Sequence, residues 1–127
     1  MRLFGAKIDH NVKVFPSTKI SQPWNLEIAS GSIISWRSIL YCLGQVYIGR
    51  NVLISQGVHL CAGSHDISKV NLPLIKKEIY IDDFSWIASE AFIGPGVRIG
   101  KYSVVGARSV IVNNVNDHQI KVGNPAR

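Results

Sequence analysis

The sequence predicts an all-β protein, a parallel β-helix built from repeats of six residues. Aliphatic residues recur at every sixth position over most of the chain, small residues often follow them, and one polar segment interrupts the pattern. An amphipathic helix would repeat about every 3.6 residues and a half-buried strand every second residue, so the period excludes both as the main element. The chain has 127 residues, of which 46% are apolar and 17% charged, and this composition excludes intrinsic disorder. We therefore expect a single domain spanning residues 1–127, with enough chain to bury a core.

The aliphatic anchors divide the chain into four runs. They are Ile8, Val14 and Ile20; Ile28, Ile34 and Leu40; Ile48, Ile54 and Leu60; and Ile81, Ile87, Ile93, Ile99, Val105 and Ile111. Each repeat supplies a short strand and a turn, and three repeats make one coil of a triangular prism. The anchors are expected to point into the prism and to stack on the anchors of the coils above and below. Residues after the anchors are often small, such as Gly49 and Gly100, and glycine at a tight corner can adopt a positive φ.

The six-residue register is interrupted at three places. Two-residue shifts occur near residues 26–28 and 46–48, and a larger break lies between Leu60 and Ile81. Within this break the sequence from His65 to Pro73 is polar and contains a proline. We predict a loop that protrudes from one corner of the prism around residues 66–78. Insertions in repeat proteins collect on one face, often the binding face, so this loop is the first place to look for chemistry.

Four histidines are candidates for chemistry. His65 stands at the corner that opens the loop, where it is either a general base or a solvated corner residue. His59 ends its repeat and points either outward or towards a neighbouring coil, while His10 and His118 are expected to face solvent. A zinc ion needs three or four converging ligands, and no third histidine lies near His59 and His65 in the sequence. We expect no metal site.

The charge, the cysteines and the apolar segments limit the partners and the compartment. The net charge of +6 suits an anionic partner, but the basic residues are scattered and form no nucleic-acid motif, so we expect no nucleic-acid binding. Cys42 and Cys61 lack metal-type spacing and are expected to be free thiols. The most apolar stretch, residues 32–43, is too short for a membrane span and contains Arg37, and residues 1–4 do not form a signal peptide. We expect a cytoplasmic protein.

Residues 51–66, which read NVLISQGVHLCAGSHD, resemble the colanic-acid-type acetyltransferases of the hexapeptide-repeat O-acetyltransferase superfamily. The resemblance extends to residues 2–8 and 105–109 and to the ending Gly-Asn-Pro-Ala at 123–126, and thus covers essentially the whole chain. It implies a left-handed β-helix. It also implies a homotrimer, in which acetyl-CoA lies in a groove between adjacent prisms. It also implies acetyl transfer to a sugar hydroxyl, in the synthesis of a surface polysaccharide.

The resemblance assigns roles to individual residues. His65 matches the catalytic histidine and would act as general base, while Asp66 would orient His65 or the acceptor sugar. The remaining matches concern the cofactor: Trp86, Ser89, Gly106 and Ala107 would line the pantetheine groove, and Arg127, with Lys121 or Arg108, would meet the CoA phosphates. Ordinary alternatives stay open at these positions, namely corner packing for Trp86, a repeat glycine at 106, and solvated surface charges.

Two departures from the family pattern bear on function. Cys42 stands where a more polar residue is expected, which would alter the acceptor site. Family members run longer at both ends, which affects the part of the CoA phosphate pocket expected beyond Arg127. The alternative function is therefore a non-catalytic trimeric β-helix scaffold, or a truncated and inactive member of the family.

Overall fold

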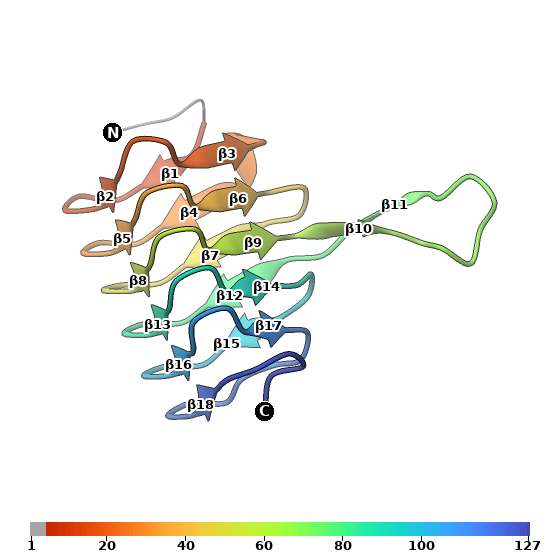
Figure 1. Cartoon of the computed structure of the whole chain (residues 1–127). Helices are drawn as coiled ribbons and strands as arrows, with labels where there is room; N and C mark the ends of the chain where they lie inside the picture. Colours follow the sequence, from red (N-terminus) through yellow and green to blue (C-terminus); the bar gives the residue numbers. More distant parts are fainter. Residues whose placement is uncertain (1–4) are drawn as a thin grey trace.

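Three parallel sheets enclose one aliphatic core in the computed structural model, which describes residues 5–127 (Figure 1). Face A contains β1 (Lys7–Ile8), β4 (Leu26–Ile28), β7 (Val46–Ile48), β12 (Ile79–Ile81) and β15 (Arg98–Ile99). Face B contains β2 (Lys13–Val14), β5 (Ile33–Ile34), β8 (Leu53–Ile54), β13 (Trp86–Ile87), β16 (Val104–Val105) and β18 (Ile120–Lys121). Face C contains β3 (Lys19–Ser21), β6 (Ile39–Tyr41), β9 (His59–Cys61), β14 (Phe92–Ile93) and β17 (Val110–Ile111).

The chain visits the faces in the order A, B, C and then begins the next coil. The first coil is β1–β3, the second β4–β6, the third β7–β9, the fourth β12–β14 and the fifth β15–β17. A sixth coil begins where Val115 forms a parallel bridge with Ile99, and it continues through β18. We name the corners after the faces that they join: the A/B, B/C and C/A corners.

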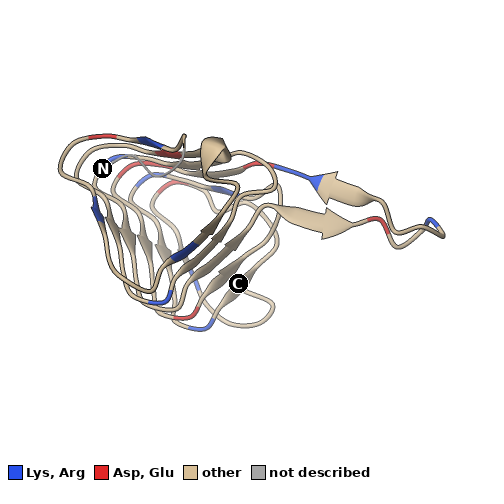
Figure 2. Cartoon of the chain, turned by 90° about the horizontal axis from the view of Figure 1, so that it is seen from above, with Lys and Arg blue, Asp and Glu red and all other residues tan. Residues whose placement is uncertain are grey.

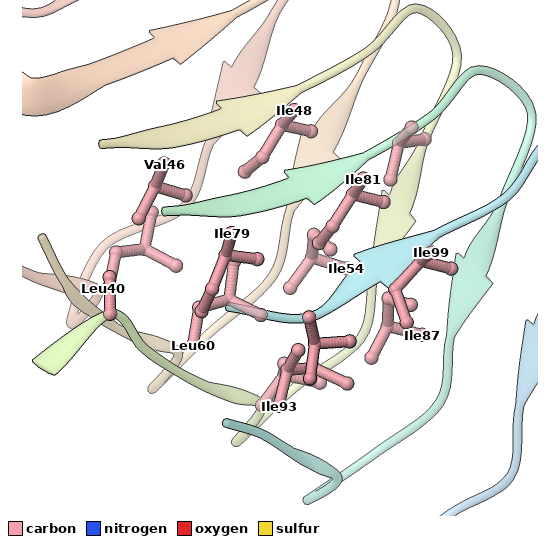
Figure 3. Close-up of a cluster of buried hydrophobic side chains, with 14 of the residues drawn as sticks. Leu40, Val46, Ile48, Ile54, Leu60, Ile79, Ile81, Ile87, Ile93 and Ile99 are labelled. Carbon is pink, nitrogen blue, oxygen red and sulfur yellow. The ribbon is translucent and has the colours of Figure 1, made fainter. Parts of the chain in front are cut away.

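The anchors predicted from the six-residue period form the core. All those from Ile28 to Ile111 are buried, and Figure 3 shows how those of successive coils stack inside the prism. Ile8, Val14 and Ile20 of the first coil are half-buried, because among the described residues the first coil has a neighbouring coil on one side only. The positional prediction of the core is confirmed.

All the register shifts fall at the C/A corner. Parallel pairing joins Lys7 to Glu27 and Glu27 to Tyr47, offsets of 20 residues, whereas Tyr80 pairs with Arg98 at an offset of 18. The two extra residues of the first turn lie where the 3₁₀ helix η1 (Pro23–Asn25) occupies this corner. The largest insertion, between β9 and β12, leaves the prism at the same corner. The C/A corner is thus where this solenoid accepts added chain.

The expected reason for the corner glycines is wrong. Gly49 and Gly100 do not have a positive φ; the left-handed residue comes two positions later, at Asn51 and Tyr102. Glycine is needed instead because the next coil passes very close. A Cβ on Gly100 would lie 2.5 Å from the backbone nitrogen of Asp117, a distance that real Cβ atoms do not adopt.

The three outer surfaces differ in polarity. Face A carries a polar and aromatic row in which Tyr47 stacks on Tyr80, with ring centroids 4.5 Å apart, and Arg98 lies over Tyr80. The outward rows of the other faces are mostly apolar. The face B row runs through Lys13, Ile33, Leu53, Trp86, Val104 and Ile120, and the face C rows through Lys19, Ser21, Ile39, Tyr41, His59, Cys61, Phe92 and Val110. Lys and Arg residues are distributed around the prism with acidic residues between them (Figure 2).

Candidate active site

The predicted loop is a hairpin that projects far from the prism (Figures 1 and 2). Its strands are β10 (Gly63–His65) and β11 (Leu74–Lys76), which pair antiparallel with His65 opposite Leu74. The predicted boundaries, 66–78, thus cover the tip and the returning strand but miss the outgoing strand. Ser64 is exposed in β10.

The ring of His65 is fixed by the returning chain. Its Nδ1 lies 2.8 Å from the carbonyl oxygen of Leu72. A carbonyl only accepts hydrogen bonds, so in the neutral ring Nδ1 carries the proton and Nε2 carries the lone pair. Leu72 adopts a left-handed conformation, φ 46°, which is uncommon for a leucine. The exposed imidazole therefore has the tautomer that a general base requires, with Nε2 available to accept a proton.

Asp66 does not provide that contact. Its Oδ1 accepts hydrogen bonds from the hydroxyl of Ser68, 2.6 Å away, and from the backbone N–H of Ser68, 3.0 Å away. The hydroxyl, and then the N–H, lower the pKa of the Asp66 carboxyl. The carboxylate therefore stabilises the turn after β10, and the orienting partner of His65 is Leu72. The acceptor-binding role of Asp66 stays a prediction.

Trp86 lies on the outside of face B, 46% exposed. Its indole Nε1 donates a hydrogen bond to the hydroxyl oxygen of Ser55, 2.9 Å away in the preceding coil. This bond fixes the indole against the prism and leaves the Ser55 hydroxyl proton able to donate to a ligand. The packing role considered for Trp86 and a role in a ligand groove are compatible in this geometry.

Small residues continue from Trp86 along the B/C corner. Ser89 follows β13 and is half-buried, and in the next coil Gly106 and Ala107 occupy the equivalent corner. A Cβ on Gly106 would collide with the side chain of Val122 in the coil below, so this glycine has a packing function of its own. Ala107 is exposed, and its small side chain projects little from the backbone at this corner.

The three basic residues predicted to meet phosphates differ in their surroundings. Arg108 donates from Nε to a carboxylate oxygen of Glu90, 3.2 Å away, in an exposed ion pair. Lys121 is half-buried in β18. Arg127 is exposed, and its backbone pairs with Val122 beside the B/C corner. Arg127 is thus the arginine of this set that no ion pair holds among the described residues.

The other three histidines do not join His65. His59 is half-buried with its ring edge-to-face with Phe92, and burial lowers its pKa below the usual value of 6.5. His10 and His118 are exposed as expected. No group of three or more His, Cys, Asp or Glu residues converges on a metal position in residues 5–127. In the same residues, no helix has the length and hydropathy needed to cross a membrane.

The expectation for Cys42 is wrong. Its side chain is fully buried in the core, where burial raises the pKa of the thiol to about 12. It therefore contacts no ligand at the surface and does not alter an acceptor site. Cys61 is half-buried on face C, and both cysteines are free, as predicted.

The candidate residues lie at two separate corners of one chain. His65 and Asp66 follow β9 at the C/A corner. Trp86 opens β13 on face B with its indole bonded to Ser55 beside the B/C corner, and Ser89, Gly106 and Ala107 lie at that corner. Face C separates the two groups (Figure 1). One isolated chain therefore does not bring the predicted base and the predicted cofactor groove together.

Sequence analysis missed two residues of the site. The Leu72 carbonyl has no sequence signal, since the residue before a proline is normally extended and not left-handed. Ser55 could have been found, because it follows an anchor one coil before Trp86, which places both at the same face.

The chain is similar to proteins with assigned activities, although no protein-family model matches it. It is 40% identical over 126 residues to WcaF of Escherichia coli strain K12, described as a colanic acid biosynthesis acetyltransferase, covering 99% of this chain and 69% of that protein. It is 30% identical to the galactoside O-acetyltransferase of the same strain, covering 96% of this chain and 62% of that protein.

Solved structures agree with this relation. A hexapeptide-repeat-containing acetyltransferase of Vibrio cholerae, in complex with acetyl-CoA, superposes with a TM-score of 0.92 at 30% identity, over 98% of this chain and 69% of that one. A galactoside acetyltransferase in complex with coenzyme A gives a TM-score of 0.89 at 27% identity, over 95% of this chain and 62% of that one. The prediction of a left-handed parallel β-helix is confirmed. The chain belongs to the hexapeptide-repeat acetyltransferase family.

Proposed function

We propose that the chain, as a single domain, is an acetyl-CoA-dependent O-acetyltransferase that acts on a sugar hydroxyl in the synthesis of a surface polysaccharide. The observation that carries the proposal is the bond from His65 Nδ1 to the Leu72 carbonyl at 2.8 Å, which leaves Nε2 as a base at the foot of an exposed hairpin. The relatives support the substrate classes, because their names specify colanic acid biosynthesis and galactosides.

The reaction needs one base and a bound thioester. Nε2 of His65 accepts the proton of the sugar hydroxyl while the hydroxyl oxygen attacks the thioester carbon. The tetrahedral intermediate then collapses, the carbon–sulfur bond breaks, and the imidazolium returns the proton to the departing CoA thiolate. The Leu72 carbonyl keeps the ring oriented and stabilises the imidazolium through Nδ1. Holding both substrates in one site supplies much of the acceleration.

The B/C corner is the proposed place for acetyl-CoA. Trp86 and Ser89 would border the pantetheine arm, and the small residues Gly106 and Ala107 would let this narrow arm approach the backbone. Arg127, exposed at the C-terminal end of the same corner, would meet the phosphates with its planar guanidinium. The corner supplies hydroxyl and backbone groups to polar atoms of the arm.

A homotrimer completes the site. The hairpin of one chain and the B/C groove of another can meet only if chains assemble, because within one chain face C separates them. The apolar outward rows of faces B and C suit burial against neighbouring subunits, whereas the charged row of face A suits solvent. A closed ring with this head-to-tail contact gives every subunit one hairpin partner and one groove partner.

Calorimetric titration with acetyl-CoA, beside light scattering for mass, tests the proposal. We expect a trimer that binds acetyl-CoA and releases CoA thiol when methyl β-galactoside or maltose is added. His65→Ala is expected to bind acetyl-CoA normally and to transfer roughly 10²- to 10⁴-fold more slowly, while His10→Ala, at another corner, behaves as wild type.

A folded trimer that binds no acetyl-CoA would favour the scaffold alternative. Full activity of His65→Ala would remove the proposed base.

A further inference from the structure

An aromatic pair stands at the N-terminal end of the B/C corner. Phe15 follows β2 and Trp36 follows β5, and their rings meet edge to face with centroids 4.5 Å apart. Trp36 is 50% exposed although tryptophan is usually well buried. The pair is not needed to fill the core, because the inward-pointing anchors already occupy the interior of the prism.

The pair belongs to the same row as the proposed cofactor groove. Backbone hydrogen bonds from the residue after each face B strand run to the coil below and define this row. In order along the prism, its first positions are Phe15, Ser35, Ser55, Ala88 and Gly106, and its second positions are Pro16, Trp36, Gln56, Ser89 and Ala107. The first two coils therefore contribute aromatic side chains to the row, the third contributes the hydroxyl of Ser55, and the fourth and fifth contribute small side chains.

The position of the hairpin along the prism indicates which coil of this row lies beside the reacting atoms. The hairpin leaves the prism directly after β9, so His65 belongs to the third coil, the coil of Ser55. Subunits related by rotation about an axis parallel to the prism keep each coil at its own level. A thioester carbon near Ser55, with its cofactor arm extending over Ala88 and Gly106, leaves the first and second coils for the second substrate.

We propose that Trp36, supported by Phe15, is the platform on which the acceptor sugar stacks. This inference rests on the proposed function and adds the residue that selects the acceptor. A pyranose ring has an apolar C–H face that packs on an indole and a rim of hydroxyls that needs polar partners. Two polar residues adjoin Trp36 in the chain, the half-buried Ser35 and the exposed Arg37.

Trp24 offers a matched control. It is 63% exposed but lies in η1, at the C/A corner between the first and second coils, where face C separates it from the row of its own chain. Exposure alone therefore does not distinguish the two tryptophans; their corners do. If Trp36 binds sugar, its replacement affects the acceptor, and the replacement of Trp24 does not.

The experiment compares Trp36→Ala, Trp36→Phe and Trp24→Ala with wild type. Acetyl transfer to methyl β-galactoside and to maltose is followed by thiol release, with each substrate varied in turn. For Trp36→Ala we expect the KM for the better sugar to rise roughly two- to twelve-fold, with the KM for acetyl-CoA unchanged, since stacking on an aromatic ring is worth about 0.5–1.5 kcal/mol. Trp36→Phe is expected to retain part of the affinity, and Trp24→Ala all of it.

Saturation-transfer difference NMR with the same two sugars separates this inference from the proposed function. Sugar signals that are present with wild type and Trp24→Ala, and lost with Trp36→Ala, would support the platform even if no transfer were seen. An unchanged sugar KM in Trp36→Ala, an equal loss of acetyl-CoA affinity, or no sugar signal with wild type would overturn it. Dissociation of the assembly by both Trp36 variants would show instead that the pair is a subunit contact.

Discussion

Two inactive variants, mixed, are expected to restore activity, because the hairpin and the groove of one site come from different chains. His65→Ala disables the hairpin. Ala107→Trp fills the groove at an exposed corner position, where the fold can accept a larger side chain. Each variant alone is expected to be inactive. Equal amounts are unfolded together in denaturant and refolded, so that the subunits assemble at random.

The expected activity follows from the arrangement of corners. A site works when its hairpin comes from the Ala107→Trp chain and its groove from the His65→Ala chain, which occurs at about one quarter of the sites in a random ring. A site contained within one chain would give no activity in this mixture. The initial rate of CoA release, relative to refolded wild type, measures the fraction directly.

The double variant supplies the matched control. Mixed with an equal amount of wild type, it is expected to leave about one quarter of the sites active if they are shared, and about one half if each lies within a chain. Native mass spectrometry verifies that mixed assemblies form. The reasoning is refuted if mixed assemblies form and the two single variants show no recovery, or if the control retains half of the activity.

Three further predictions concern the fold. Ile87→Ala, at a fully buried anchor, is expected to lower the free energy of unfolding by about 2–5 kcal/mol, and Val14→Ala in the half-buried first coil by less; equal losses in urea denaturation would contradict the stacked core. Gly100→Ala is expected to cost about 1–3 kcal/mol, because its Cβ would meet the backbone of Asp117, and an unchanged melting temperature would disprove this contact. Burial lowers the pKa of His59, so below about pH 6.5 the unfolded state binds the proton first and the free energy of unfolding falls. His59→Gln is expected to reduce this fall in unfolding curves measured between pH 7.5 and 5. The same dependence of stability on pH in wild type and variant would count against the prediction.

The sequence predicted the core and the course of the chain because the six-residue period is set by packing. An anchor must fit against the anchors above and below, so its position in the prism follows from counting alone. The counting also places Ile81, Ile87 and Ile93 on faces A, B and C, so the separation of His65 from Trp86 could have been predicted from the same period.

Contacts between coils could not be predicted in this way. The glycine at position 100 is set by the path of the Asp117 backbone in the next coil, and only the structure shows how close that path is. The Leu72 carbonyl reaches His65 through a left-handed residue that no local propensity favours. Cys42 was misplaced because it follows an anchor by two residues in a corner with extra chain, where the period no longer indicates which way a side chain points.

The regular stack of coils fixes the spacing of residues along the B/C corner. Adjacent strands in a sheet lie about 4.8 Å apart, so residues along this corner can be separated only by whole multiples of that step. Ser55 and Gly106, which belong to the third and fifth coils, are therefore about 10 Å apart along the prism, whatever their side chains. Adding one coil between them would lengthen the site by one step without changing a residue at either end. Side chains in this architecture set which groups a ligand meets, and the number of coils sets how long that ligand is.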